Sequence, residues 1–105
     1  MSEDFRSIIE EQAEIHHIFS NPSRLLILWE LEAHEMSVGE IAERIGATLQ
    51  NTSQHLRLMK DKGMLEARRE GQTVYYQIAG NEIGQDCKLV LKILNSKIQS
   101  FIQEA

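Results

Sequence analysis

Apolar residues recur every three or four positions through much of the chain, which is the spacing of amphipathic helices. Three longer helices are predicted in this way, over residues 3–19, 22–33 and 81–103. A polar stretch at residues 10–14 interrupts the apolar face of the first. Asn21 as N-cap and Pro22 at the first helical position begin the second, and its high leucine content predicts that it is the most buried.

Two shorter helices are predicted in the middle of the chain. Ser37 and Glu40 have the spacing of a capping box, in which each side chain accepts a hydrogen bond from the other's backbone N–H. Gly46 stands where a left-handed residue ends a helix, and Thr48 can cap a second helix from Leu49 to about residue 62. A helix, a short turn with glycine and a second helix form a helix-turn-helix.

A β-hairpin is predicted to follow, with strands at residues 64–69 and 73–78 around a glycine-containing turn. The expected fold is therefore mainly α with a small β-hairpin, a winged helix-turn-helix with four helices, two strands and a fifth helix. We expect one domain over residues 1–105, with a DNA-reading unit at about residues 37–78. The helices at about residues 3–19 and 81–103 are expected to join two copies, since they carry more apolar surface than a small core can cover.

Composition agrees with a single compact domain. The chain has 105 residues, 42% of them hydrophobic, and one proline, so long linkers are not expected. One cysteine cannot form an internal disulfide, and no basic segment followed by an apolar stretch marks a secretion signal. The expected location is the cytoplasm, with no membrane contact.

The charge is unevenly distributed. A net charge of −5 argues against a nucleic-acid ligand when the chain is taken as a whole. However, residues 1–43 carry ten acidic and two basic side chains, whereas residues 44–77 carry six basic and three acidic ones. A polyanion is therefore expected to bind the middle segment, which holds the helix-turn-helix and the hairpin.

The predicted helix at residues 49–62 has one apolar and one polar side. At about 100° per residue, the side expected to pack inward consists of Leu49, Thr52, Leu56 and Met59. Amide and guanidinium side chains near the start of such a helix are suited to bidentate bonds with base edges in the major groove. The side chains predicted to contact DNA from this helix and its cap are Thr48, Gln50, Asn51, Ser53, Gln54, His55, Arg57 and Lys60.

The hairpin adds further candidates. Arg68 and Arg69 point to opposite faces of a strand, so one is expected on the DNA backbone or in the minor groove, and the other can pair with Glu66 or Glu70. Gln72 at the turn is a candidate phosphate donor. Of Tyr75 and Tyr76, one ring is expected in the core and one over the hairpin.

Four blocks of the chain resemble the ArsR/SmtB family of bacterial and archaeal repressors. The blocks lie within residues 16–79 and read Asn-Pro-Ser-Arg-Leu-Leu-Ile-Leu (21–28), Ser-Val-Gly-Glu-Ile-Ala (37–42), Ser-Gln-His-Leu (53–56) and Arg-Arg-Glu-Gly-Gln-Thr-Val-Tyr-Tyr (68–76). The resemblance implies a homodimer that binds an imperfect palindrome in a promoter and releases it when an inducer binds. It also implies a structural or phosphate-contacting role for His55.

The chain departs from the family's known sensor sites. Arsenic and cadmium sensors of the family carry two cysteines where this chain has residues 36–39, and zinc and nickel sensors use histidines of the last helix, where this chain has none. The persulfide sensors use two cysteines, and here Trp29 takes the position of the first while residues 100–103 offer no second. We therefore expect that zinc, arsenite and persulfide do not act through these sites. Trp29 is expected to fill the core. The sequence does not identify the inducer.

Other groups give only weak signals for a site. His16 and His17 are the remaining candidate metal ligands, but adjacent helical side chains diverge by about 100° and need partners such as Glu14 or Asp86 from elsewhere. Cys87, alone on an apolar stripe, is expected to be a small buried side chain with a reactive thiol as the alternative. No metal or other cofactor is expected.

An enzyme is not expected, because the sequence contains neither a catalytic constellation nor a phosphate-binding glycine loop. Two other classes of function are considered. The leading hypothesis is a homodimeric, sequence-specific repressor that binds double-stranded DNA at a palindromic operator. The alternative is a winged-helix module that binds another protein and no DNA, which the acidic net charge favours.

Overall fold

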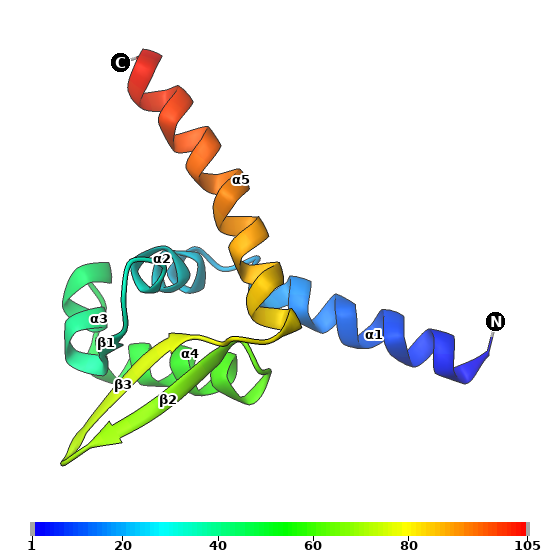
Figure 1. The fold of residues 1–105 in the computed structure, drawn as a ribbon, viewed down its shortest axis with the longest axis horizontal. Coiled ribbons are helices and arrows are strands. Elements are labelled where there is room, and N and C mark those ends of the chain that lie inside the picture. Colours follow the sequence, from blue (N-terminus) through cyan, green and yellow to red (C-terminus); the bar gives the residue numbers. More distant parts are fainter. Residues whose placement is uncertain (1, 105) are drawn as a thin grey trace.

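The computed structural model describes residues 2–104, and these form five helices and three strands (Figure 1). In chain order they are α1 (Glu3–Ile18), α2 (Pro22–Leu31), β1 (Met36–Ser37), α3 (Val38–Ile45), α4 (Leu49–Asp61), β2 (Leu65–Glu70), β3 (Thr73–Ile78) and α5 (Glu82–Glu104). The predicted winged helix-turn-helix is confirmed. The polar stretch at residues 10–14 does not break α1, and α2 ends two residues earlier than predicted.

The predicted helix starts are confirmed by their caps. The Asn21 side chain accepts a hydrogen bond from the Arg24 backbone N–H at 3.1 Å, and the Thr48 hydroxyl accepts one from the Asn51 N–H at 3.1 Å. Ser37 and Glu40 form the complete capping box of α3. Gly46 ends α3 with φ of +69°, a left-handed conformation that glycine adopts without steric cost.

The sheet contains one strand that the sequence pattern did not reveal. β1 pairs antiparallel with β3, Met36 opposite Tyr76 and Ser37 opposite Tyr75, so the strand order is β1-β3-β2. Two residues are too few to show the alternation that marks a strand. The hairpin is confirmed, with Glu70 opposite Thr73 and a two-residue turn that begins at Gly71 (φ +62°).

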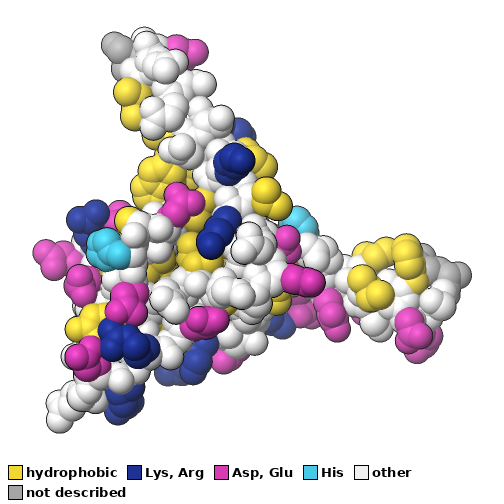
Figure 2. All heavy atoms as spheres, viewed as in Figure 1, with side chains coloured by type: hydrophobic (Ala, Val, Ile, Leu, Met, Phe, Trp, Pro, Cys, Tyr) yellow, Lys and Arg dark blue, Asp and Glu magenta, His cyan; other side chains and the backbone are white. Residues whose placement is uncertain are grey.

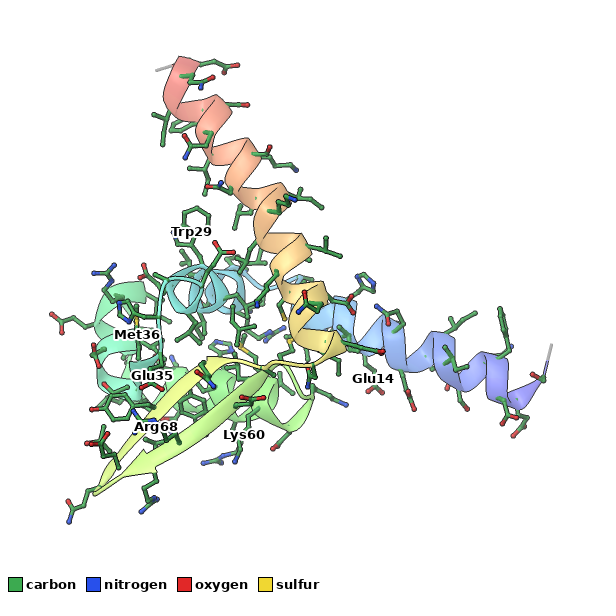
Figure 3. All side chains as sticks on the ribbon, in the orientation of Figure 1. Glu14, Trp29, Glu35, Met36, Lys60 and Arg68 are labelled. Atoms are coloured by element: carbon green, nitrogen blue, oxygen red, sulfur yellow. The ribbon has the colours of Figure 1, made fainter. Side chains whose placement is uncertain are left out.

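The core lies between α2, α3, α4, the sheet and the first half of α5. Its fully buried side chains include Ile27 and Leu28 of α2, Ile41 of α3, Leu56 and Met59 of α4, and Cys87 and Leu91 of α5. The expectation that Trp29 fills the core is wrong. Its ring is half-buried at the edge of the core, in an apolar groove between α2 and α5 (Figure 3).

Both terminal helices project from this core, α1 to one side and α5 to another (Figure 1). Seven of the ten large apolar side chains that are exposed lie on them: Phe5, Ile8 and Ile9 on α1, and Leu89, Ile93, Phe101 and Ile102 on α5. Apolar surface of this extent on a small protein is typical of an interface. Within residues 2–104, no helix combines the length and apolar character needed to cross a membrane.

Candidate nucleic-acid interface

Helix α4 separates a buried apolar side from an exposed polar side. Thr52, Leu56 and Met59 are completely buried, as predicted, whereas Leu49 is 60% exposed, so its predicted inward position is wrong. Leu49 is the first residue of the helix and lies beyond the edge of the core. Of the predicted contact residues, Gln50, Asn51, Gln54, Arg57 and Lys60 are exposed, and Ser53 and His55 are half-buried.

The start of α4 is open to an anion. Its first turn carries no acidic side chain, and the helix dipole places partial positive charge there. Thr48 is exposed, and its hydroxyl oxygen accepts the capping hydrogen bond from Asn51, which leaves the hydroxyl proton free to donate. A phosphate oxygen is an acceptor suited to this position.

His55 differs from the rest of the polar side. Burial and the nearby positive charge of Arg24 lower the pKa of the imidazole below its ordinary value. The ring is therefore neutral at pH 7 and offers no charge to a phosphate. A neutral imidazole can still donate a hydrogen bond from its N–H, so this argues against an ionic contact with a phosphate and leaves both implied roles open.

The hairpin places its two arginines in different surroundings. The Arg68 guanidinium donates from Nη2 to Glu35 Oε1 at 2.5 Å and from Nη1 to Glu70 Oε2 at 2.8 Å, and lies 4.8 Å from the centre of the Tyr75 ring (Figure 3). Both hydrogen bonds raise the pKa of Arg68 and the Arg68 bond lowers that of Glu35. Pairing with Glu70 was predicted for one of the arginines, whereas pairing with Glu35 was not.

Arg69 lies on the other face of β2. Residues two apart on a strand share a face, so Arg69 shares the face of Leu65, which is buried against the helices. Tyr76 also packs against the core, while Tyr75 lies beneath Arg68, as the alternation of the two rings predicts. Arg69 therefore lies on the face of the hairpin that packs against the helices, close to the hairpin tip, where Gln72 is exposed.

Ion pairs divide the basic side chains of residues 44–77 into two sets. Three are paired with carboxylates: Arg44 with Glu30 (2.9 Å), Lys62 with Glu14 (2.6 Å), and Arg68 as described. The other three, Arg57, Lys60 and Arg69, form no ion pair within residues 2–104. Figure 2 shows basic side chains over the hairpin and the adjoining edge of the molecule, with acidic ones around α3 and along α1.

Two contacts that sequence reasoning missed connect α1 to α2 and to the end of α4. Arg24 donates from Nε to the Ile18 carbonyl at 2.8 Å, at the C-terminal end of α1 where carbonyls lack partners. The Lys62–Glu14 pair joins the end of α4 to α1 and lowers the pKa of Glu14. The Glu14–Lys62 partners are 48 residues apart, so no local pattern reveals them.

The candidate sensor groups are the two histidines of α1 and Cys87 of α5. Among residues 2–104, no cluster of three or more His, Cys, Asp or Glu side chains is placed to hold a metal ion. His16 and His17 are exposed, and His16 shares a hydrogen bond of 3.1 Å with Gln12. Cys87 is completely buried, and burial raises the pKa of its thiol to about 11.

The thiol of Cys87 is expected to be unreactive in the folded protein. At pH 8, a pKa of about 11 instead of 9.0 lowers the thiolate fraction about 100-fold, and the thiolate is the reacting species. A disulfide reagent should therefore modify the folded protein at least about 100-fold more slowly than the same protein in urea. Absorbance of the released thiolate measures both rates. Equal rates would support the single-thiol sensor that the sequence left open.

Comparison with known proteins places these features in a family. A model described as a helix-turn-helix domain matches residues 19–68. The chain is 32% identical over 72 residues to the transcriptional regulator KmtR of Mycobacterium tuberculosis, a match that covers 69% of this chain and 55% of KmtR. It is 38% identical to the nodulation protein NolR of Rhizobium meliloti, over 82% of this chain and 68% of NolR. The chain thus spans about half the length of KmtR and two thirds of NolR.

A solved structure agrees over nearly the whole chain. It is the homodimeric winged helix-turn-helix DNA-binding domain of a possible ArsR-family transcriptional regulator from Mycobacterium bovis. The TM-score is 0.81 at 31% identity, and the alignment covers 95% of this chain and 93% of that one. The family blocks, the observed fold and these relatives together show that the chain belongs to the ArsR/SmtB family of winged helix-turn-helix transcriptional regulators.

Proposed function

We propose that this protein is a homodimeric, sequence-specific transcriptional repressor that binds double-stranded DNA in the cytoplasm and has no catalytic activity. The observation that carries the proposal is a set of three cations, Arg57, Lys60 and Arg69, which form no ion pair within residues 2–104 and accompany the exposed amides of α4. Cations bind phosphates and fix the register, while amides at the start of a recognition helix reach base edges.

The proposed reading unit consists of α3, α4 and the hairpin. Gln50, Asn51 and Gln54 would reach the major groove. Thr48, Ser53, Lys60 and Gln72 would contact phosphates, and Arg57 either kind of group. The proposed dimer interface consists of the exposed apolar faces of α1 and α5, which would place two α4 helices on a palindromic site. Relatives are named as regulators of transcription, which supports this function over a protein-binding module.

The proposal is tested by selecting duplexes from a random DNA library with the purified protein. A palindromic consensus is expected, with half-sites about one helical turn apart. Affinity for that duplex should fall steeply as salt rises, because bound cations release counterions from DNA. Recovery of no consensus, together with salt-independent binding, would favour the protein-interaction module.

Replacing Gln54 with alanine is expected to weaken binding to the selected duplex by about 1–3 kcal/mol, because a bidentate amide would be lost from the groove. Preference at one base pair of each half-site should relax. Competition between single-base variants of the duplex measures this. If discrimination at every position is unchanged, Gln54 does not contact a base.

The two hairpin arginines are expected to differ when each is replaced with glutamine. Arg69→Gln should lower affinity for all sequences alike and reduce the salt slope by about one phosphate contact. Arg68→Gln should have the smaller effect, because its guanidinium is occupied by Glu35 and Glu70. Binding measured over a range of salt concentrations separates them, and a larger loss for Arg68 would reverse the assignment.

A further inference from the structure

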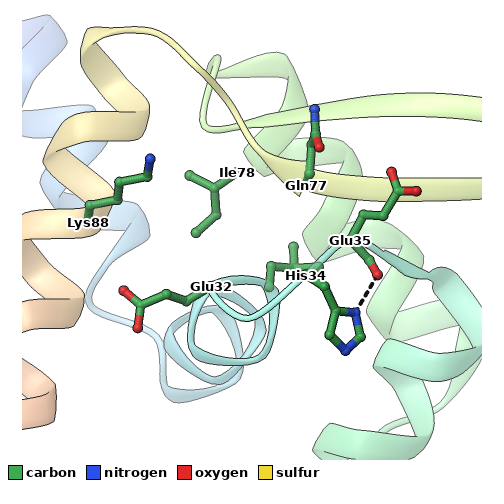
Figure 4. Close-up of a pocket in the computed structure, with 7 residues that line it drawn as sticks. Glu32, His34, Glu35, Gln77, Ile78 and Lys88 are labelled. Carbon is green, nitrogen blue, oxygen red and sulfur yellow. Dashed lines mark hydrogen bonds between the residues drawn. The ribbon is translucent and has the colours of Figure 1, made fainter.

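A cavity of about 340 Å³ lies between the end of α2, strand β3 and the second turn of α5, away from the polar side of α4 (Figure 4). Leu31, which is 3% exposed, and the half-buried Ile78 form its apolar floor. Lys88 of α5 and Glu32 at the end of α2 line it at the α5 side. Sites for small molecules have volumes of about 300–1,000 Å³ and combine an apolar lining with a few polar groups.

The polar side chains that line this cavity differ in whether another side chain already binds them. Glu35, at the opposite side, binds Arg68, and Gln77 donates to Glu66 at 3.1 Å. Lys88 and Glu32 instead form no ion pair within residues 2–104, either with each other or with another side chain. Among the described residues, the cavity therefore offers one cation and one carboxylate without an ion-pair partner, beside an apolar floor.

We propose that this cavity binds a free α-amino acid with an apolar side chain. An anion bound to Lys88 would be repelled by the nearby Glu32, and a cation bound to Glu32 would be repelled by Lys88. A molecule that carries both a negative and a positive charge therefore suits the pair best. Its carboxylate would accept hydrogen bonds from Lys88 and its ammonium group would donate to Glu32. Its side chain would pack on Ile78 and Leu31 and remove from water the surface that the half-buried Ile78 still exposes, since Leu31 is already buried.

The bound amino acid regulates DNA binding, an inference that rests on the proposed function. The walls of the cavity belong to α5, which is proposed to join the dimer, to the end of α2 and the segment that follows it, and to β3 of the hairpin. One wall residue, Glu35, also holds Arg68 on the hairpin. Occupancy thus fixes the hairpin relative to α5, and a ligand that binds one arrangement better shifts the population toward it.

Calorimetric titration of the DNA-free protein tests the site directly. The probes are L-leucine, 4-methylpentanoate, which lacks the ammonium group, and 3-methylbutylamine, which lacks the carboxylate. Leucine is expected to bind at least about tenfold more tightly than either analogue, because each analogue loses one charge-assisted hydrogen bond. Absence of leucine binding, or equal binding of the three probes, would overturn the proposal.

Matched variants locate the binding. Lys88→Gln and Glu32→Gln, both at exposed positions, should each weaken leucine binding at least about tenfold. Lys92→Gln, one turn further along α5 and outside this cavity, should leave it unchanged. If leucine binds all three variants as it binds the original protein, the site is elsewhere and the assignment is wrong.

The regulatory part has a separate readout. Saturating leucine should change the affinity for the selected duplex at least about fivefold in the original protein and not in Lys88→Gln. Leucine binding without this change would overturn the regulatory part. If no duplex is bound at all, the proposed function fails, while the titrations without DNA still decide whether the site exists.

Discussion

Replacing Gly84 with alanine is expected to destabilise the folded protein by about 3 kcal/mol or more, beyond the range of most overpacking substitutions. A Cβ at this position would lie 1.7 Å from the Ala79 carbonyl oxygen and 2.8 Å from the Ala79 carbonyl carbon. Both are backbone atoms, so no side-chain rotation relieves the clash. The first turn of α5 would have to move away from the strand that precedes it.

The structure leaves little room for that movement. The Gly84 N–H donates to the Asn81 side chain at 2.8 Å, which caps α5, and Asn81 in turn donates to the Gly63 carbonyl at 3.0 Å. The Ala79 N–H donates to the Met64 carbonyl at 2.8 Å. Displacing α5 would therefore break connections to the end of α4 as well as to the hairpin.

Gly39→Ala is the matched control. Gly39 is exposed in α3, and a Cβ there would meet nothing within 4 Å. Because alanine favours helix more than glycine does, this change is expected to stabilise the protein by about 0.5–1 kcal/mol. Urea unfolding at one fixed protein concentration measures both variants, since the stability of a dimer depends on concentration. A loss of less than about 1 kcal/mol for Gly84→Ala would contradict the predicted clash.

Features that depend on neighbouring residues in the chain were predicted from the sequence. The caps at Asn21, Ser37 and Thr48 and the left-handed Gly46 each need only a few consecutive residues, and all are present. The helix-turn-helix and the hairpin follow from such signals. Family blocks then extended the prediction from fold to function.

Features that depend on distant partners were not predictable in the same way. Leu49 and Trp29 have apolar side chains at helical spacing, but their burial depends on whether another element covers them, and the core ends beside both. β1 exists because β3 passes next to it. The pairing of Arg68 with Glu35 joins residues 33 positions apart. Sequence reasoning therefore gave the basic segment but not which of its cations are free.

The close approach at Gly84 was not predictable either, although its partner Ala79 lies only five residues earlier in the chain. Its glycine lies inside a predicted helix, where the local rule says only that glycine weakens the helix. The reason for glycine at this position is the Ala79 carbonyl, whose location depends on how the chain turns between β3 and α5. A glycine inside a helix is a sequence signal for such an approach, but it does not identify the partner.

Reversing two of the free cations, in the double variant Arg57→Glu/Arg69→Glu, is expected to reduce affinity for the selected duplex at least about 100-fold at physiological salt. Two phosphate or base contacts would be lost, and two carboxylates would repel the DNA backbone. The net charge of residues 44–77 would change from +3 to −1. Since both side chains are exposed and form no ion pair in the described part of the chain, the free energy of unfolding should change little.

The control for this reversal has the same total charge but a different location. Lys92→Glu/Lys97→Glu places the added carboxylates on exposed positions of α5. These positions flank Leu89 and Ile93 of the proposed dimer interface, so light scattering on the same samples must show that the assembly state is unchanged. Long-range repulsion between the protein and DNA is screened beyond about 8–10 Å at physiological salt, so this control should lose far less affinity. Equal losses in the two double variants would mean that net charge, and not a local interface on α4 and the hairpin, governs binding. Unchanged binding in Arg57→Glu/Arg69→Glu would show that DNA does not contact this face.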